Sequence, residues 1–221
     1  MDTLRIYSVF RGFRRKRMAR FIREFRPGAE TTILDVGGFA NFWAGSGVAS
    51  RITIVRPEGP EALPAGTPPN LRSIGGDGCD LREHADQSYD LVFSNSVIEH
   101  VGDEAQQRAF AREARRVGRS VWVQTPAREF PLEPHLLTPF IHWLPPSLQE
   151  RLLPWTVWAL LRTPAERSVW AEHVRARLLS RREMQEWFPG ARIITERFCG
   201  WPKSYIAYLA GEAERREPRP A

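Results

Sequence analysis

Short apolar runs recur along the chain, and turn-forming residues bound most of them. Runs of about four to eight residues that are rich in Ile, Val, Leu and aromatic side chains are typical of buried strands. Seven segments have this character: 31–36, 51–56, 71–77, 89–96, 120–126, 191–198 and 204–210. The first of them, TTILDV, lies between Pro27-Gly28 and Gly37-Gly38, which predicts a short strand between two turns.

A helix signal lies between the fourth and fifth of these segments. Asp103 can cap a helix over 104–117, on which Ala105, Ala109 and Val117 form a small apolar stripe. Strands that alternate with helices at this spacing predict a parallel sheet with helices on both faces.

Residues 180–211 continue this plan with one helix and two strands. Ser180 followed by Glu183 is a capping-box pattern that begins a helix over 181–188, which Pro189-Gly190 ends. The connection 199–203 is short enough to join an antiparallel pair of strands. The chain therefore predicts an α/β fold with a mostly parallel seven-stranded sheet and an antiparallel closing strand.

Residues 127–179 do not follow the alternation, since they are rich in Pro, Leu and Trp, and we expect them to form an inserted helical cap. With 221 residues, the chain is long enough for one α/β domain with an insertion. We therefore expect a single domain over 1–221, with a core at 31–126 and a disordered, charged tail at 212–221.

The positive charge is concentrated at the N-terminus. Nine basic side chains against Asp2 and Glu24 give residues 1–26 a net charge of +7, so the other 195 residues sum to about −1, since the whole chain carries +6. Apolar residues recur in this segment near helical spacing: Ile6, Phe10, Phe13, Met18, Phe21 and Phe25. The pattern predicts a basic amphipathic helix that packs on the domain with a solvated arginine face, or that contacts an anionic membrane or nucleic acid phosphates. Of the last two, the membrane is favoured.

Other features narrow the class of protein. No apolar run approaches the roughly 20 residues that span a bilayer. The first residues scatter arginines among apolar positions, which is not the pattern of a secretory signal, so we expect a cytoplasmic protein, with peripheral contact at the inner membrane face as its alternative place. Cys79 and Cys199 have neither metal-binding nor redox spacing, and we expect no bound metal.

The turn after the first strand is the first candidate for chemistry. Ligands of open parallel sheets bind outside the carboxyl ends of the strands, and Gly37 and Gly38 would let a ligand approach the backbone there. A nicotinamide dinucleotide would require G-x-G-x-x-G for its pyrophosphate, and this pattern is absent.

Three segments in order resemble one known family. Asp35-Val-Gly-Gly resembles the first-strand turn of class I S-adenosylmethionine-dependent methyltransferases, GGDGCDL at 75–81 resembles their third-strand turn, and YDLVFSNSVIEHV at 89–101 resembles their fourth-strand end. The resemblance covers about 31–126. It implies a Rossmann-like doubly wound sheet, S-adenosylmethionine as the cofactor, and transfer of a methyl group to an acceptor.

The family's roles can be carried over to matching positions of this chain. By this resemblance, Asp35 and the backbone of Gly37, Gly38 and Asn41 would meet the methionyl end of the cofactor. The cofactor has no phosphate group for the protein to neutralise. The carboxylate of Asp35 would accept a hydrogen bond from the methionyl ammonium group, directly or through water.

The third and fourth motifs would hold the rest of the cofactor. Asp77 would accept from the adenine amino group, with backbone contacts from Gly78 and Cys79, although an aspartate in such a turn also has an ordinary structural role. Ser94 and Asn95, at the end of the fourth strand, would lie beneath the sulfonium.

Two positions depart from the family pattern. Arg56 stands where the family ends its second strand with an acid that binds the ribose hydroxyls, and a guanidinium has no acceptor for them. Glu58 can take that role two residues later; otherwise ribose binding is weaker or lost. The third glycine of the first motif is also missing, although Asn41 tolerates unusual turn geometry.

Two pairs of residues are candidates for a general base. Glu99 and His100 follow the fourth strand near the expected position of the methyl group, or they only fasten the following helix. His135 with Glu133, just beyond the fifth strand, is the second candidate.

The insertion bears on the acceptor. Trp143, Trp155 and Trp158 lie among leucines and prolines, which predicts a lid whose apolar face is buried or, alternatively, faces lipid or an acyl chain. Together with the basic N-terminal segment this favours O-methylation of a small molecule or a lipid-linked saccharide, and the phrase TPAREFPLEPH at 125–135 resembles small bacterial methyltransferases of surface-glycan pathways.

Two other classes of function remain open. A nucleic acid methyltransferase would explain the basic helix, but residues 95–98 lack the N-P-P-Y type of base-amino site. A degenerate methyltransferase fold that binds a partner without catalysis would explain Arg56.

Overall fold

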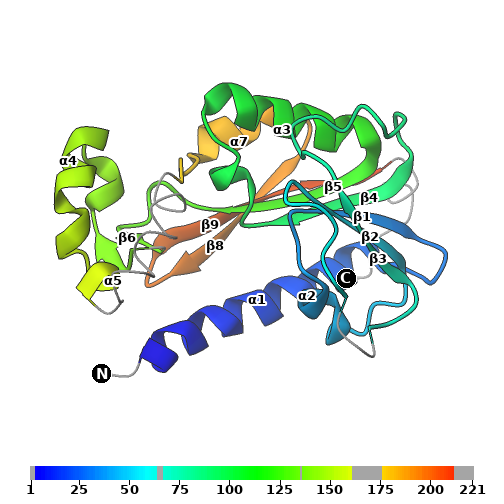
Figure 1. Ribbon diagram of the computed structural model, residues 1–221, viewed down its shortest axis with the longest axis horizontal. Helices are drawn as coiled ribbons and strands as arrows, with labels where there is room; N and C mark the ends of the chain where they lie inside the picture. Colours follow the sequence, from blue (N-terminus) through cyan, green and yellow to red (C-terminus); the bar gives the residue numbers. More distant parts are fainter. Residues whose placement is uncertain (1–2, 64–66, 135, 161–175, 212–221) are drawn as a thin grey trace.

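The protein is described by a computed structural model over residues 3–63, 67–134, 136–160 and 176–211, with the side chains of the first helix described from residue 12 onward. A seven-stranded sheet runs through it in the order β3-β2-β1-β4-β5-β9-β8 (Figure 1). Its strands are β1 Thr32–Val36, β2 Arg51–Arg56, β3 Leu71–Gly75, β4 Tyr89–Asn95, β5 Gly118–Pro126, β8 Arg192–Phe198 and β9 Trp201–Leu209.

Strands β1 to β5 are parallel, and β9 is antiparallel to both β5 and β8. The predicted α/β class, the seven strands and the antiparallel closing strand are thereby confirmed. The third strand ends at Gly75, two residues before its predicted end, because the chain turns at Asp77, whose carbonyl accepts from the amide of Asp80 (2.9 Å).

Helices cover the two faces of this sheet unequally. On one face lie α1 Thr3–Phe25 and α2 Ala40–Ala44, and on the other lie α3 Glu104–Val117 and α7 Arg181–Trp187 (Figure 1). In the described residues between β2 and β3, and between β3 and β4, no helix forms; these connections are turns and bends. The described residues of these two crossovers are therefore loops.

The alternation of side chains along β1 assigns residues to these two layers. Ile33 faces the layer of α1 and α2, whereas Leu34 and Val36 face the layer of α3 and α7, and all three are buried. Since successive side chains of a strand point to opposite faces, Asp35 faces the same layer as Ile33. A carboxyl group thus lies in the apolar layer beneath the first helix.

Helix α3 begins as predicted, but its buried face differs. Asp103 accepts from the amide of Gln106 in a capping box. Of the predicted stripe only Val117 is buried, and Ala105 is exposed, so that part of the prediction is wrong. The large ring of Phe110 sets the helix phase, and the residues that share its face are Gln107, Ala111, Ala114 and Val117.

Helix α7 confirms the other capping signal. Ser180 accepts from the amide of Glu183, and the Glu183 carboxylate accepts from the amide of Ser180 (2.7 Å). Burial alone would raise the pKa of Glu183, but hydrogen bonds from Ser180 and the charge of Arg177 outweigh it and lower the pKa. The cap therefore keeps its charge at the positive end of the helix.

Helix α1 packs on the domain. Met18 and Phe21 are buried, and Phe25 packs beside them against Trp122 and Tyr208 of the sheet. The apolar face of this half of the helix is therefore used by the core. The side chains of Ile6 and Phe10 lie outside the described residues.

The insertion forms a small unit after β5. It contains the hairpin β6 Leu132–Glu133 and β7 Thr138–Pro139, followed by η2 Ile141–Trp143, α4 Pro146–Leu152, η3 Leu153–Trp155 and α5 Val157–Leu160. Its ends are joined, because Ala127 bridges Leu179 and the amide of Arg128 donates to the Leu179 carbonyl (3.0 Å). His135, the side chain of Trp158, residues 161–175 and the tail 212–221 lie outside the described part. No described helix combines the length and hydropathy needed to cross a bilayer.

Candidate functional site

A cavity of about 750 Å³ lies at the carboxyl edge of the parallel strands. Ligands of open α/β sheets bind at this edge, since the loops that follow neighbouring strands meet there. The residues that line it follow β1, β2, β3 and β4 or face them from α3: Val36, Gly37, Phe39, Val55, Arg56, Pro57, Glu58, Gly76, Asp77, Gly78, Ser96, Val97, His100, Val101 and Phe110. A second cavity of about 530 Å³ lies at the opposite edge, by the first residues of the same strands.

The turn after β1 forms one wall of the first cavity. Gly37 has a φ of +76°, which favours glycine, and its amide donates to the carbonyl of Val55 (2.9 Å). A Cβ on Gly37 would lie 2.5 Å from Val97 Cγ1, so this glycine also permits close packing of the turn that follows β4.

The structure gives Gly38 a packing role beside the predicted one. A Cβ at this position would lie 1.7 Å from Oδ2 of Asp35, so the glycine makes room for a buried carboxylate. Gly38 and Asn41 do not line the cavity, and Asn41 is exposed in the first turn of α2. The amino end of α2 is instead met by Glu61, which accepts from the amide of Ala40 (3.0 Å).

Asp35 is almost fully buried, with 1% of its surface exposed. Its Oδ2 accepts from the indole Nε1 of Trp43 (2.6 Å), and its Oδ1 has no hydrogen-bond partner among the described residues. Burial raises the pKa of Asp35 to about 7, although the hydrogen bond from Trp43 opposes the rise. A cationic group that reached this buried carboxyl group would stabilise its ionised form.

The turn after β3 forms a second wall. Asp77 lines the cavity, and its Oδ1 accepts from the amide of Cys79 (2.8 Å). Gly78 lies against Val36 and Phe110, where a Cβ would come within 2.6 Å of Val36 Cγ1. Cys79 does not line the cavity; burial raises the pKa of its thiol to about 12, so the thiol stays neutral.

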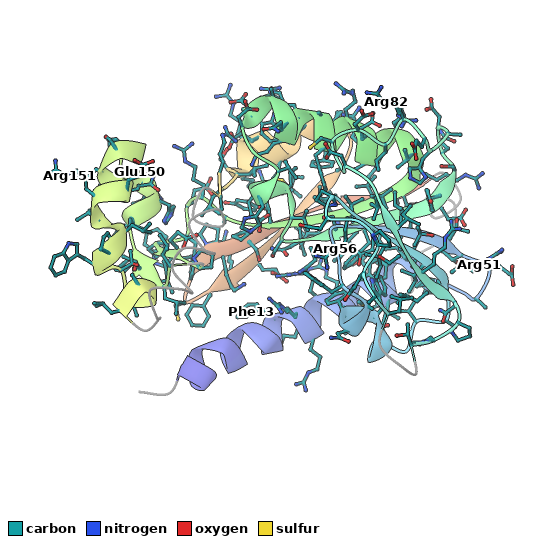
Figure 2. All side chains as sticks on the ribbon, viewed as in Figure 1. Phe13, Arg51, Arg56, Arg82, Glu150 and Arg151 are labelled. Carbon is teal, nitrogen blue, oxygen red and sulfur yellow. The ribbon has the colours of Figure 1, made fainter. Side chains whose placement is uncertain are left out.

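Arg56 occupies the end of β2, where the family pattern has an acid. Its guanidinium lies 4.1 Å from the centroid of the Phe39 ring, and its Nε donates to Glu58 Oε2 at 3.3 Å. All three side chains line the cavity, and Figure 2 shows Arg56 near the middle of the molecule. Glu58 is mostly exposed, so it can move toward or away from a ligand.

The turn after β4 places Glu99 and His100, the first candidate pair, in different surroundings. His100, in the 3₁₀ turn η1 Ile98–His100, is exposed and lines the cavity. Glu99 is fully buried and does not line it: its Oε2 accepts from Thr125 Oγ1 (3.0 Å) and its carbonyl accepts from the amide of Arg177 (2.9 Å). Glu99 thus fastens the turn to β5 and to the end of the insertion.

Ser94 and Asn95 are held by the protein itself. Ser94 is buried and donates to the carbonyl of Val36 (2.9 Å), which ties β4 to β1. The Oδ1 of Asn95 accepts from Arg17 on α1. Ser96, which lines the cavity at a φ of +57°, donates to Gln124 Oε1 (3.0 Å).

Arg17 is the centre of a buried polar cluster on the face of the sheet beneath α1. Its Nη1 donates to Asn95 and to Gln124 Oε1 (2.6 Å), and its Nε and Nη2 donate to the two oxygens of Glu196 on β8. Ser204 on β9 also donates to Glu196. Arg14, Arg15 and Lys16 are exposed, as a solvated basic face predicts, whereas Arg17 is buried.

Lys203 adds a further cation beside this cluster. Its Nζ lies 4.5 Å from the centroid of the Phe13 ring. Burial and the charges of Arg17 and Arg14 lower the pKa of Lys203 to about 8, against the opposing effect of Glu196. The sequence offered no signal for this group, because α1, β8 and β9 meet only in the fold.

The structure thus brings five of the predicted residues into one cavity: Gly37, Glu58, Asp77, Gly78 and His100. Of the others, Asp35, Gly38, Asn41, Cys79, Ser94, Asn95 and Glu99 lie behind or beside its walls, and His135 lies outside the described residues. Sequence reasoning missed Phe110 and Ser96. The position of Ser96 beside the fourth-strand motif could have indicated it, whereas Phe110 depends on the phase of α3. No group of three or more His, Cys, Asp or Glu side chains in the described ranges could hold a metal ion.

Comparison with known proteins bears on the family resemblance and on the fold. Residues 44–120, less than half of the chain, match the family model described as a methyltransferase domain. No curated protein sequence matches the chain.

Solved structures share the fold at low identity. Phosphoethanolamine N-methyltransferase 2 of Haemonchus contortus, solved with phosphomonomethylethanolamine and S-adenosylhomocysteine, has a TM-score of 0.51 at 14% identity, over 81% of this chain and 39% of its own. Its structure with S-adenosylmethionine has a TM-score of 0.53 at 12% identity, over 89% and 53%. This chain therefore spans about half of that enzyme's length or less.

A third structure, from Rhodobacter sphaeroides and described as a Zn-dependent alcohol dehydrogenase, has a TM-score of 0.58 at 11% identity and covers 88% of each chain. At these identities the likeness shows the fold alone. Together with the matched domain, it confirms the resemblance to class I methyltransferases that the three motifs indicate.

Proposed function

Because the chain has the fold of the S-adenosylmethionine-dependent methyltransferases, we propose that it binds this cofactor in the cavity at the carboxyl edge and transfers its methyl group. The observation that carries the proposal is the meeting of three sequence motifs in one cavity of about 750 Å³. That volume lies within the range of small-molecule sites, roughly 300–1,000 Å³.

The residues present fit the cofactor's chemistry. Asp77 presents a carboxylate for the adenine amino group, and Phe39 and Phe110 supply apolar surface for the ring. The methionyl end carries an ammonium group, and Oδ1 of Asp35 is a buried acceptor that no described residue satisfies. We propose that this oxygen accepts from the ammonium group, directly or through water.

When bound, S-adenosylmethionine supplies an electrophilic methyl group on a good leaving group. The protein has mainly to orient an acceptor atom and to exclude water. His100 lines the cavity at the end of β4, where it could take a proton from an acceptor hydroxyl, and we propose it as the base. Its removal would then lower turnover by about 10² to 10⁴. Glu99 holds the turn that positions His100.

For the acceptor we propose a small molecule or a lipid-linked saccharide, methylated on oxygen. The insertion supports this choice, because it leaves β5 at the same edge of the sheet and exposes Trp143 and Trp155. His135 and Glu133 stay the second proposed pair; Glu133 is buried and accepts from the amide of Leu136 (2.5 Å).

Calorimetry tests the proposal directly. Wild-type protein should bind S-adenosylmethionine and S-adenosylhomocysteine, and Asp77→Ala should weaken both by about tenfold or more, the usual effect of losing a charge-assisted hydrogen bond. Asp80→Ala is the matched control, since Asp80 is exposed in the same loop and pairs with Arg82 outside the cavity.

Absence of heat at about millimolar ligand, with a folded protein, would contradict the proposal and favour the non-catalytic alternative. The nucleic acid alternative is tested by gel shift at low and high salt, since phosphate contacts weaken steeply with salt.

A further inference from the structure

Large apolar side chains are exposed mainly in one part of the molecule. Among the described residues, seven of the eleven exposed large apolar side chains lie within 140–160, so they are concentrated in the insertion. Trp155 is 76% exposed and Leu160 is 66% exposed. Large apolar side chains that gather in solvent on one segment are candidates for contact with a partner or a membrane.

The fold of the insertion does not require these side chains. Leu136, Ile141 and Ala159 form a separate small core, against which Leu144 and Leu153 pack. Leu148 and Leu152, four residues apart on α4, are exposed together on one side of that helix. We call Leu148, Leu152, Trp155, Val157 and Leu160 the outer face of the insertion; all five are exposed.

Phe140 extends the exposed apolar surface at a cost. This residue has a φ of +61°, a conformation that bulky side chains seldom adopt, and its ring is 53% exposed. The amide of Phe140 donates to the carbonyl of Pro131 (2.7 Å), which holds the strained turn in place, and its ring lies 5.2 Å from that of Trp143. Strain that keeps an aromatic ring in solvent indicates a use for the ring outside the fold.

Basic residues lie at the same end of the molecule. Residues 3–16 of α1 contain five basic side chains (Arg5, Arg11, Arg14, Arg15 and Lys16) and no acidic one. The first half of α1 and helices α4 and α5 lie together at one end of the long axis (Figure 1). Within 140–160 the charged side chains are Glu150 and Arg151, which project there and have opposite signs, so this described stretch adds no net charge to that of α1 (Figure 2).

We propose that the outer face of the insertion docks on an anionic lipid bilayer, with its tryptophan and leucine side chains in the interface and the basic half of α1 near the headgroups. Tryptophan and leucine beside arginine and lysine are the side chains that interfacial segments use. A second copy of the chain fits less well. A symmetric dimer through this end would bring two segments of +5 together, whereas anionic lipid would neutralise them.

If the acceptor is linked to a lipid, the protein would meet it at the bilayer on which the outer face docks. That link rests on the proposed function, but membrane binding does not, so the two can fail separately. A protein that binds S-adenosylhomocysteine and ignores vesicles would refute only the docking surface, and the reverse result would refute only the cofactor site.

Vesicle co-sedimentation of the full chain tests the proposal, with phosphatidylcholine alone and with phosphatidylcholine mixed with phosphatidylglycerol. Wild type should bind the acidic vesicles and leave the neutral ones largely unbound. The double variant Trp155→Ser/Leu160→Ser should lower the partition by at least about tenfold, because each large side chain loses its transfer into the interface. Leu63→Ser is the matched control, since Leu63 is exposed in the loop after β2.

A charge variant separates the two contributions. Arg14→Glu/Arg15→Glu should weaken binding to acidic vesicles, most strongly at low salt, whereas Arg51→Glu/Arg82→Glu, exposed elsewhere on the molecule, should not. Equal binding by wild type and Trp155→Ser/Leu160→Ser would overturn the proposal. It would also be overturned if sedimentation without lipid showed a dimer that this double variant abolishes, because the outer face would then contact a second copy.

Discussion

Arg17 of the first helix and Glu196 of the penultimate strand, 179 residues apart in sequence, form a two-point ion pair with donor–acceptor distances of 3.1 and 2.5 Å. Arg17 is 5% exposed and Glu196 is 13% exposed, so the pair is shielded from water. Burial alone would raise the pKa of Glu196, but the charge of Arg17 and its hydrogen bonds lower it instead. The contact joins α1 to β8, the edge strand of the sheet.

Removal of Arg17 should destabilise the fold. We expect Arg17→Met to lower the free energy of unfolding by about 3 kcal/mol, because the carboxylate of Glu196 would be left buried without its cation. Urea denaturation measures this change. Arg15→Met, on the exposed side of the same helix, should stay within about 0.5 kcal/mol of wild type. The double variant Arg17→Met/Glu196→Gln should recover part of the loss, and an unchanged loss would contradict the ion-pair explanation.

Lys203 should titrate near neutrality. Lys16 and Lys203 are the only lysines in the chain, so carbon-13 methyl labels on both amines give two assignable NMR signals. The signal of Lys203 should report a pKa of about 8, lowered by burial and by Arg17. Arg17→Met should raise this pKa and Glu196→Gln should lower it further. A pKa of about 10.5 for Lys203 would show that the cluster is more hydrated than its geometry indicates.

Asp35 should make stability depend on pH. Its pKa is about 7 in the folded chain against an ordinary 3.8, so between these values the folded chain holds a proton that the unfolded chain has lost. The stability that Asp35 contributes is therefore present at low pH and declines as pH rises through about 7. The free energy of unfolding of Asp35→Asn and of wild type should be measured at several pH values. The difference in favour of Asp35→Asn should grow as the pH rises and become constant above about pH 7. A constant difference would contradict a raised pKa.

Gly38 should tolerate no side chain. The Cβ of Gly38→Ala would lie 1.7 Å from Asp35 Oδ2, and the forced movement should lower the free energy of unfolding by about 2 kcal/mol. Gly45→Ala is the control, because its Cβ would meet no atom within 4 Å. Thermal unfolding compares the two, and equal stability would show that Asp35 relaxes without cost.

Arg56 should limit cofactor affinity if the proposed function holds. Arg56→Glu would place an acceptor at the end of β2, where ribose hydroxyls can donate to it, and should tighten binding of S-adenosylhomocysteine by about tenfold. Calorimetry measures the change. Arg51→Glu, at the other end of the same strand, should leave affinity unchanged. Weaker binding by Arg56→Glu would mean that the guanidinium and Phe39 contribute to the site as they stand.

Much of the fold is local in origin and can be inferred from the sequence. The segments 31–36, 51–56 and 89–96 form strands because each is a short apolar run with turn-forming residues beside it. The caps of Asp103 and Ser180 form from residues at most three positions away. Once the strands are parallel, their carboxyl ends must share one edge, so Gly37, Asp77 and His100 could be placed together without coordinates.

Contacts between distant elements could not be inferred in this way. Arg17 reaches Glu196, 179 residues away, only because α1 packs on the face of the sheet to which Glu196 points. The spacing of apolar residues showed that α1 has an apolar side, but it does not identify the residues against which that side packs. The sequence by itself determined the sheet, the caps and the edge of the sheet at which we propose that the cofactor binds. Only the tertiary structure decided that Asp35 is buried, that Arg17 is a core residue and that the outer face of the insertion lies in solvent, because burial depends on which surfaces the packed layers cover.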